Sequence, residues 1–261
     1  PWGSRDNEEC RIDSISQSWA VLAGYGHESR VKTAMRAARD KLLIDKDRLV
    51  LLLDPPFHHS SRDPGYIRAY PPGIRENGGQ YSHAATWMGL AFAGMGDGDT
   101  AWRVFDILNP LRRTLDPEAV QRYQREPCVL AGDIYSLDGH RGRGGWRGYT
   151  GASGWTWPVG VAGILGLRQV GGGVSIKPCL PKHWGGAKLT VRREEGTINI
   201  TILDPDHVGS GVSFITVNGE RVQDELLQLP GQGKAIAVTV RLGIEAQRAA
   251  PLQIPLSHSS S

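Results

Sequence analysis

The hydrophobic pattern of this chain changes its period near residue 172, and this change constrains the fold more than any other feature. Before Gly171-Gly172-Gly173, apolar residues recur every three to four positions, the spacing of amphipathic helices. After these glycines, apolar residues alternate with polar ones, as at Ile198, Ile200 and Ile202, which is typical of strands. The sequence therefore predicts a mainly helical region followed by a β domain.

Six segments of the first region have helical spacing or helix-start signals. They cover approximately residues 12–23, 28–43, 82–95, 101–108, 117–123 and 152–167. The first two form a hairpin, because Gly24 and Gly26 end the first helix. Pro158 must kink the last helix or lie near its start. Residues 54–72 form a long irregular stretch whose aromatic residues indicate that it is ordered.

The second region has the pattern of an all-β module. Apolar alternation continues after residue 200, and the Asn218-Gly219 pair is typical of a two-residue hairpin turn. We therefore divide the chain into a helical domain at 1–172, a β-sandwich at 173–245 and a disordered tail at 246–261.

Composition excludes several classes of protein. A net charge of +3 with dispersed basic residues argues against a nucleic-acid partner. Three widely spaced cysteines form neither a disulfide framework nor a zinc motif and fit a reducing compartment. No apolar run is long enough to cross a bilayer, and the first residues do not resemble a signal peptide. The chain is expected to be cytoplasmic, alone or as part of a membrane-attached parent protein.

Polar residues are concentrated in Arg75-Glu76-Asn77-Gly78-Gly79-Gln80-Tyr81-Ser82-His83, just before an apolar helical pattern. Glycines at 78 and 79 allow a sharp turn or close approach to a ligand. The surrounding amides, hydroxyls and imidazole offer hydrogen-bond donors and acceptors. Two interpretations remain open: these side chains either cap the start of the helix or bind a ligand.

A second motif, from Gly139 to Gly151, is rich in glycine and arginine. Thr150 and Gly151 lie just before a predicted helix, where free N–H groups and the helix dipole favour an anion. No Gly-Lys-Ser/Thr follows, so this is not a Walker loop. It is either a phosphate cradle or a flexible connector with solvated arginines. Tryptophans beside glycines, as at Trp146, suit sugar stacking as well as core packing.

These motifs together resemble the inverting glycoside phosphorylases of glycoside hydrolase family 94, over approximately residues 3 to 220. The shared motifs, in order, are Glu9-Cys10-Arg11-Ile12-Asp13-Ser14-Ile15, Pro55-Pro56-Phe57, Pro64-Gly65-Tyr66-Ile67, the Arg75–Tyr81 motif, Glu126-Pro127, Gly142-Arg143-Gly144-Gly145-Trp146, Tyr149-Thr150-Gly151 and Pro178-Cys179-Leu180-Pro181. Within the family, the chain is similar to the C-terminal phosphorylase-like region of cyclic β-1,2-glucan synthases and to β-1,2-oligoglucan phosphorylases. The resemblance implies the second half of an (α/α)6 barrel followed by a C-terminal β-sandwich.

The resemblance also implies roles for individual residues. His83, Thr150 and Gly151 correspond to phosphate-binding positions, and the substrate-binding positions correspond to Arg75, Glu76, Gln80 and Tyr81. Phosphate is itself the nucleophile, so one carboxylic acid suffices and no second carboxylate acts as base. That acid is an Asp in a Trp-Asn-Asp-Gly motif, which is absent from this chain and expected upstream. Inorganic phosphate is a co-substrate, and no cofactor or metal is implied.

The implied function is phosphorolysis of β-linked glucooligosaccharides, with β-1,2 as the expected linkage, to give α-glucose 1-phosphate. The chain would be one piece of a hexosyltransferase-type phosphorylase, completed by the N-terminal part of its parent or by oligomerisation. The alternative is a non-catalytic carbohydrate-binding or accessory fragment of a cyclic β-glucan synthase. An inverting hydrolase would need a second carboxylate about 6.5–9.5 Å from the acid. Neither Asp133 nor Asp138 has a position in the sequence that marks it as the acid.

Overall fold

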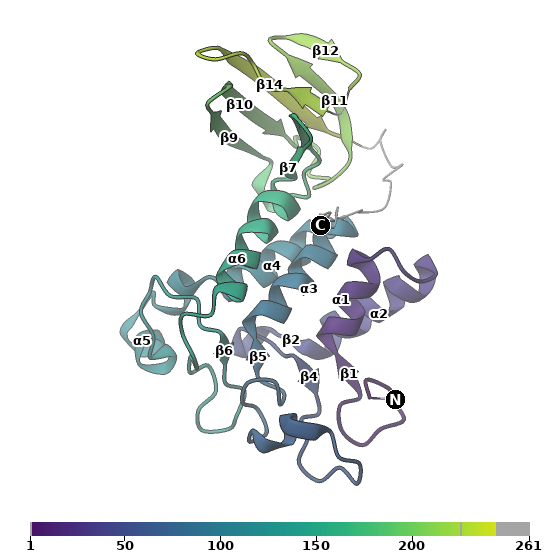
Figure 1. Cartoon of the computed structure of the whole chain (residues 1–261), viewed down its shortest axis with the longest axis vertical. Coiled ribbons are helices and arrows are strands. Elements are labelled where there is room, and N and C mark those ends of the chain that lie inside the picture. The colour runs from purple at the N-terminus through teal and green to yellow at the C-terminus, as the bar shows by residue number, and fades with distance from the viewer. Residues whose placement is uncertain (1, 225, 244–261) are drawn as a thin grey trace, which may run out of the picture. The chain divides into compact units, whose positions relative to one another are not determined.

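The computed structural model describes residues 2–224 and 226–243 and divides the chain into two compact units. Among the described residues, one unit comprises 2–91 and Arg103–Thr156, and the other comprises Phe92–Trp102 and 157–243. The α-helices precede the two larger sheets along the chain, as the hydrophobic pattern predicts (Figure 1). The (α/α)6 barrel, the sandwich and the domain limits stay predictions, and the predicted disordered tail lies outside the described residues.

The α-helices of the described residues correspond to the six predicted segments. They span Ser14–Leu22 (α1), Glu28–Leu42 (α2), Ser82–Gly94 (α3), Gly98–Leu108 (α4), Pro117–Tyr123 (α5) and Thr150–Pro158 (α6). The last is shorter than predicted, because the chain continues as a π-helical turn at Val159–Ile164. Within the described part of the chain, no helix combines the length and apolar character needed to cross a membrane.

Local side-chain chemistry fixes where two of the helices, α1 and α5, begin. Asp13 accepts a hydrogen bond from the Ser16 N–H at the start of α1, and Asp116 does the same for the Ala119 N–H at the start of α5. Pro117 occupies the first turn of α5, where its missing N–H has no helical partner to lose. Both helix starts are therefore defined by residues adjacent in sequence.

Short two-residue ladders organise the first unit. Strand β1 (Ile12–Asp13) pairs with β4 (Leu53–Asp54), and β2 (Leu43–Ile44) pairs with β3 (Leu49–Val50). Strand β5 (Gln80–Tyr81) pairs antiparallel with β6 (Asp133–Ile134). Beside these ladders lies a cluster of buried residues, made of Leu49, Tyr123, Ala131 and Ile134.

The long stretch after β4 is held in place by side chains from other segments. Asn77 is fully buried: its Oδ1 accepts from the Phe57 N–H at 2.7 Å, and its Nδ2 donates to the carbonyls of Phe57 and Tyr70 at 2.8 Å each. The Glu9 carboxylate accepts from the N–H groups of His59 and Ser60 at 2.7 and 2.9 Å. The stretch is thus ordered, as its aromatic residues indicate.

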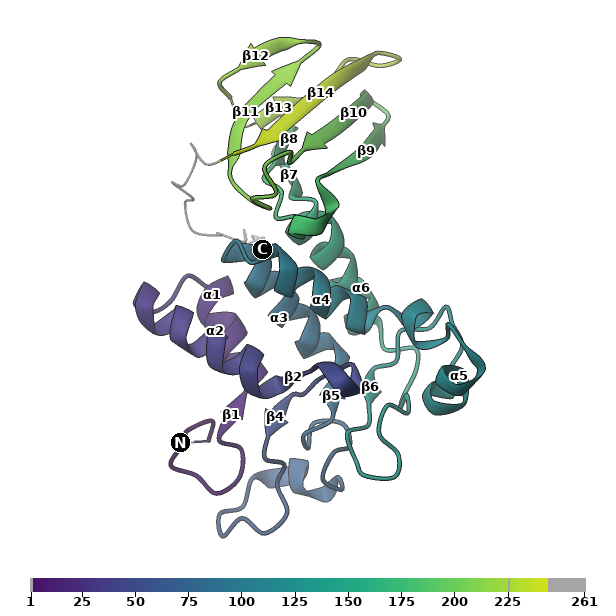
Figure 2. The same ribbon diagram turned by 180° about the vertical axis from the view of Figure 1, so that it is seen from behind.

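The second unit contains two sheets (Figures 1 and 2). The larger has the order β12-β11-β14-β10-β9 and consists of Gly186–Arg193 (β9), Gly196–Leu203 (β10), Val212–Val217 (β11), Glu220–Val222 (β12) and Ala235–Leu242 (β14). The smaller has the order β13-β8-β7 and consists of Leu167–Val170 (β7), Gly173–Ile176 (β8) and Leu226–Gln228 (β13). Among the strands that the structure describes, only β10 and β14 pair in parallel, with Ile200 opposite Val238.

Glycine-containing turns join the strands of both sheets. Asn218 and Gly219 both have positive φ, at 50° and 91°, and connect β11 to β12 as their dipeptide predicts. Gly171, with φ of 55°, belongs to the turn between β7 and β8, which pair antiparallel. The change of hydrophobic period near residue 172 therefore coincides with a hairpin turn inside a sheet.

Replacing Asn77 by Ala should destabilise the first unit strongly. The substitution leaves the buried N–H of Phe57 without an acceptor and two carbonyls without a donor, which costs about 2–4 kcal/mol. Urea unfolding measures this loss. The matched control is Asn109→Ala, which removes a single exposed bond to the Leu111 N–H and should cost at most about 1 kcal/mol. Equal losses in both variants would contradict the role of Asn77.

Candidate functional site

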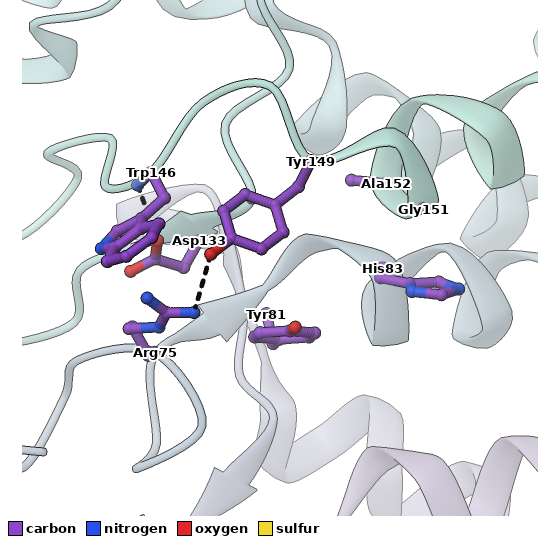
Figure 3. Close-up of a pocket in the computed structure, with 9 residues that line it drawn as sticks. Arg75, Tyr81, His83, Asp133, Trp146, Tyr149, Gly151 and Ala152 are labelled. Carbon is purple, nitrogen blue, oxygen red and sulfur yellow. Dashed lines mark hydrogen bonds between the residues drawn. The ribbon is translucent and has the colours of Figure 1, made fainter.

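A pocket in the first unit collects residues from both polar motifs (Figure 3). It is lined by Arg75, Tyr81, His83, Gly132, Asp133, Trp146, Tyr149, Gly151 and Ala152. The pocket has two ends of different chemistry. Arg75, Asp133 and Trp146 lie at one end, His83 and Gly151 lie at the other, and the two tyrosines lie between them (Figure 3).

The β5–β6 ladder brings the two motifs together. Tyr81 lies opposite Asp133, and the ladder is extended by a bond from the Ser82 N–H to the Gly132 carbonyl at 2.9 Å. On its other side, β6 bonds to the glycine-rich segment: the Gly145 N–H donates to the Asp133 carbonyl at 2.8 Å. The Gly132 N–H donates to the Trp146 carbonyl at 2.7 Å. Residues distant in sequence thus become neighbours in one small sheet.

Arg75 extends its guanidinium into a group of aromatic rings. Its Cζ atom lies 4.2 Å from the ring centroid of Trp146, and Tyr70 and Tyr149 lie at 5.3 and 5.6 Å. Nη2 of Arg75 donates to the Tyr149 hydroxyl at 3.3 Å (Figure 3). Such cation–π contacts are strengthened when the cation is partly desolvated. The Arg75 side chain is only 12% exposed.

Glu76 supplies a counter-charge to this cation. Its Oε2 lies 3.6 Å from Nε of Arg75, and the Glu76 side chain is 18% exposed. Burial lowers the pKa of Arg75, but the Tyr149 hydroxyl and the Glu76 carboxylate outweigh burial and hold this pKa above its ordinary value. Burial also raises the pKa of Tyr81, and the nearby Glu76 charge adds to this effect. Arg75 is therefore charged, and Tyr81 is a neutral phenol.

Asp133 places a carboxylate almost completely away from solvent, with 1% exposure. Its Oδ1 accepts from the Trp146 N–H at 2.9 Å, whereas its Oδ2 has no hydrogen-bond partner among the described residues. Burial raises the pKa of this carboxyl, and the backbone bond from Trp146 and the Arg75 charge oppose the shift only in part. A Cβ on Gly145 would lie 2.1 Å from Oδ1, so only glycine fits there.

His83 forms the opposite end of the pocket, in the first turn of α3. Its ring lies 4.4 Å from the Trp87 ring, and a Cβ on Gly151 would lie 2.6 Å from His83 Nδ1. The Nε2 atom of His83 is buried and has no partner among the described residues. Burial lowers the pKa of His83 below its ordinary value of 6.5. The imidazole is therefore neutral at pH 7 and has a nitrogen available for a ligand.

The structure separates the predicted site residues into two groups. Arg75, Tyr81, His83 and Gly151 line the pocket, and Glu76 pairs with Arg75. Thr150 is the exposed first residue of α6 and does not line it. Gln80 is fully buried and points elsewhere: its Oε1 accepts from the Val50 N–H at 2.9 Å, and its Nε2 lies 3.5 Å from the Ser82 hydroxyl.

Among the side chains that line the pocket, Asp133, Tyr149 and Ala152 had no role assigned from the sequence, whereas Trp146 was a candidate for sugar stacking. For Asp133, a signal was available, since an acidic residue within the apolar segment 129–135 must find a partner or a function. Trp146 and Tyr149 belong to recognised motifs. Their stacking around Arg75 depends on contacts between distant segments, which the spacing of residues in the sequence does not reveal.

The two ends of the pocket suit two kinds of ligand group. At the His83 end, an imidazole nitrogen and the first turn of a helix can donate to an anion. At the Arg75 end, aromatic faces with a carboxylate and a guanidinium suit a hydroxyl-rich ring. Among residues 2–224 and 226–243, no cluster of three His, Cys, Asp or Glu side chains is arranged to hold a metal ion.

Sequence comparison supports a carbohydrate-active class for this pocket. The model of the glycosyl hydrolase 94 superfamily catalytic domain matches residues 1–166, and the chain therefore belongs to this family. This agrees with the family resemblance found in the sequence. The match includes every residue that lines the pocket.

Curated relatives are considerably longer than this chain. Cyclic beta-(1,2)-glucan synthase NdvB of Rhizobium meliloti is 46% identical over 84% of the chain and 8% of its own length. N,N'-diacetylchitobiose phosphorylase of Vibrio proteolyticus is 31% identical over 92% of the chain and 30% of its own length. A 1,2-beta-oligoglucan phosphorylase of Listeria innocua is 28% identical over 56% of the chain and 14% of its own length. The chain thus spans less than a third of each of these proteins.

Two glycines of α6 provide a matched test of the packing at His83. In Gly151→Ala the new methyl overlaps the imidazole, which should cost about 1–3 kcal/mol and displace the ring. In Gly154→Ala the methyl meets nothing within 4 Å, and the better helix propensity should add up to about 1 kcal/mol. Thermal unfolding and the NMR shift of His83 Cε1–H measure both effects. Equal behaviour of the two variants would contradict this packing.

Asp133→Asn should change how stability depends on pH. Burial raises the pKa of Asp133 in the folded protein above 3.8, so the folded state keeps a proton that the unfolded state has released. The contribution of Asp133 is therefore fully present below pH 3.8 and is lost as the pH rises through the folded pKa. Relative to Asp133→Asn, the wild type should lose stability over this window. Urea unfolding at a series of pH values tests this, and parallel curves would contradict it.

Proposed function

We propose that this chain forms the phosphate-binding and acceptor-side part of an inverting glycoside phosphorylase active site. The substrate class is β-linked glucooligosaccharides, with β-1,2 as the linkage, and the product is α-glucose 1-phosphate. The observation that carries the proposal is the pocket in which His83 and the start of α6 face an end lined by Arg75, Trp146 and Asp133.

In the proposed reaction, every bond formed and broken is accounted for by phosphate, the glycoside and one carboxylic acid. A phosphate oxygen attacks the anomeric carbon from the face opposite the leaving sugar, and the bond from that carbon to the glycosidic oxygen breaks. A carboxylic acid donates its proton to the departing oxygen. Attack from the opposite face converts the β-linkage into an α-phosphate. In our proposal the acid is an aspartate of the parent protein upstream of these residues.

In this scheme the phosphate anion binds to His83 and to the first turn of α6. The neutral imidazole can accept the proton of a hydrogen phosphate or donate to an oxygen, and the N–H groups of the first helical turn are oriented by the helix dipole. Thr150 does not line the pocket, but its exposed hydroxyl lies at the first residue of α6, next to Gly151, and we propose it as a further phosphate ligand. Fixed donors of this kind aim the nucleophile and offset its charge as the new bond forms.

The acceptor-side sugar binds to three residues of the first polar motif, Arg75, Glu76 and Tyr81. Three aromatic rings hold the guanidinium, so its donors stay directed toward sugar hydroxyls while its charge is partly screened from the anion. Gln80 acts indirectly, because its side chain fixes the backbone of Val50 next to β5. The names of the relatives, a β-1,2-glucan synthase and a 1,2-β-oligoglucan phosphorylase, support the β-1,2 linkage.

Phosphate binding to the isolated chain tests the proposal. NMR titration should give a pKa for His83 below 6.5, and added phosphate should raise that pKa because an anion favours the imidazolium. His83→Ala should weaken phosphate binding by at least about tenfold, the loss expected for one charge-assisted hydrogen bond. His140→Ala, at an exposed turn of the same motif region, is the control. Unchanged phosphate affinity in His83→Ala would refute the anion site.

A second candidate is a non-catalytic carbohydrate-binding fragment of a cyclic β-glucan synthase. The small share of NdvB that the chain covers favours this alternative for the chain alone. Release of α-glucose 1-phosphate from β-1,2-glucooligosaccharides and phosphate separates the two. Phosphate-dependent release by the chain together with the upstream region of its parent supports the phosphorylase. Glucan binding without release by that complete protein supports the accessory role.

A further inference from the structure

The turn that carries Arg75 holds this residue in an unusual backbone conformation. Arg75 has a φ of 49°, a left-handed value that residues other than glycine rarely adopt. The turn is closed by bonds from the Asn77 N–H to the Ile74 carbonyl at 3.0 Å and from the Gly73 N–H to the Asn77 carbonyl at 2.7 Å. A Cβ on Gly79 would lie 3.0 Å from the Arg75 nitrogen, so the turn is also tightly packed. The backbone therefore fixes where the Arg75 side chain begins.

Trp146 stacks on the Arg75 guanidinium from a segment that has neither helix nor strand of its own. Trp146 is 56% exposed, so its neighbours cover only part of it. Two bonds connect its backbone to the β6 region. The Trp146 N–H donates to Oδ1 of Asp133 at 2.9 Å, and the Trp146 carbonyl accepts from the Gly132 N–H at 2.7 Å. The first of these bonds needs a side-chain acceptor at residue 133, whereas the second involves backbone atoms alone.

The Asp133 carboxylate lies beside both of these segments (Figure 3). It packs directly on the backbone of Gly145, where a Cβ would lie 2.1 Å from Oδ1 and 2.4 Å from Oδ2. Burial raises the pKa of the Asp133 carboxyl, and the Trp146 N–H, the Arg75 charge and the Arg75 N–H oppose this shift. With 1% exposure, Asp133 has almost no surface of its own to offer a ligand. Its neighbours Arg75 and Trp146 are the side chains that a ligand would meet.

We propose that Asp133 is the positioning residue of the Arg75 end of the pocket, which holds the Trp146 indole and the Arg75 guanidinium in their stacked arrangement without itself contacting the sugar. The inference rests on the proposed function, because this stack is the surface that the acceptor sugar meets. In the stack, the planar guanidinium is already ordered, so fewer side-chain rotamers are lost when a ligand binds.

Three variants test how the carboxylate holds the stack. Asp133→Ala removes the acceptor of the Trp146 N–H, and Gly145→Ala keeps the carboxylate but adds a methyl group where it lies. Asp133→Asn keeps an oxygen that can accept from Trp146 and is the conservative rescue. The nuclear Overhauser contact between the Arg75 side chain and the Trp146 ring measures the stack. This contact should be lost in Asp133→Ala and in Gly145→Ala and kept in Asp133→Asn.

Calorimetry on the full chain measures two affinities, one for a linear β-1,2-linked glucooligosaccharide and one for inorganic phosphate. Asp133→Ala and Gly145→Ala should weaken oligosaccharide binding at least about fivefold, the effect of one lost hydrogen bond, and should leave phosphate affinity within about twofold of wild type. Asp133→Asn should keep both affinities within about twofold. A merely structural role would weaken both ligands together, so the difference between them reports positioning.

Two control variants match these changes away from the pocket. Asp116→Ala removes a carboxylate that accepts one backbone N–H, that of Ala119 at 2.8 Å. Gly154→Ala adds a methyl group that meets nothing within 4 Å. Neither residue lines the pocket, so both variants should keep the contact between Arg75 and Trp146 and both affinities.

The outcomes separate the positioning role from the proposed function. Loss of the contact and of oligosaccharide affinity in Asp133→Ala and Gly145→Ala, with both kept in Asp133→Asn, supports the role. Three results would overturn it and leave the proposed function standing: the contact persists in Asp133→Ala, both ligands weaken equally there, or Asp133→Asn keeps the contact but loses oligosaccharide affinity. If the wild type binds no oligosaccharide, the acceptor side of the proposed function fails and the positioning role fails with it.

Discussion

The ladder between β5 and β6 is the constraint on which the rest of the site depends. It consists of two residue pairs, Gln80 with Ile134 and Tyr81 with Asp133, yet it joins two motifs distant in the sequence. Strand side chains alternate between faces, so a shift of one residue would turn Tyr81 and Asp133 away from the pocket. Buried Ile134 and fully buried Gln80 resist such a shift, because each would leave a favourable environment.

Three glycines are required because a side chain of the pocket packs directly against their backbone. Gly145 leaves room for the Asp133 carboxylate, Gly151 for the His83 ring, and a Cβ on Gly132 would lie 3.0 Å from the Tyr149 ring. Within the glycine-rich motif, close packing therefore requires Gly145 and Gly151, whereas a Cβ on Gly139 or Gly148 would meet nothing within 4 Å. The sequence alone could not separate close packing from a flexible connector, because the side chains that Gly145 and Gly151 contact, Asp133 and His83, lie in other segments of the chain.

The order of helices and strands could be predicted from hydrophobic period, since that signal is local. The Asn218-Gly219 turn and the start of α5 at Pro117 were likewise predictable. The roles of individual residues within the Arg75–His83 motif could not be predicted from the sequence. Asn77 and Gln80 differ from their polar neighbours in that they bond to the backbone of distant residues, Phe57 and Val50. Polarity marks such residues as important without showing which of them face a ligand.

The electrostatics of the pocket explain why its two ends would not compete for the same group. Arg75 is charged but is enclosed by aromatic rings and accompanied by Glu76, so its field is weakened before any ligand arrives. His83 is neutral because burial disfavours its charged form, and it gains charge only when an anion offsets that cost. An anion is therefore favoured where protonation of His83 can accompany it. A neutral sugar is favoured at the other end, where stacking and hydroxyl contacts dominate. In the proposed function, this separation of the two groups would orient phosphate at the His83 end and the acceptor sugar at the Arg75 end.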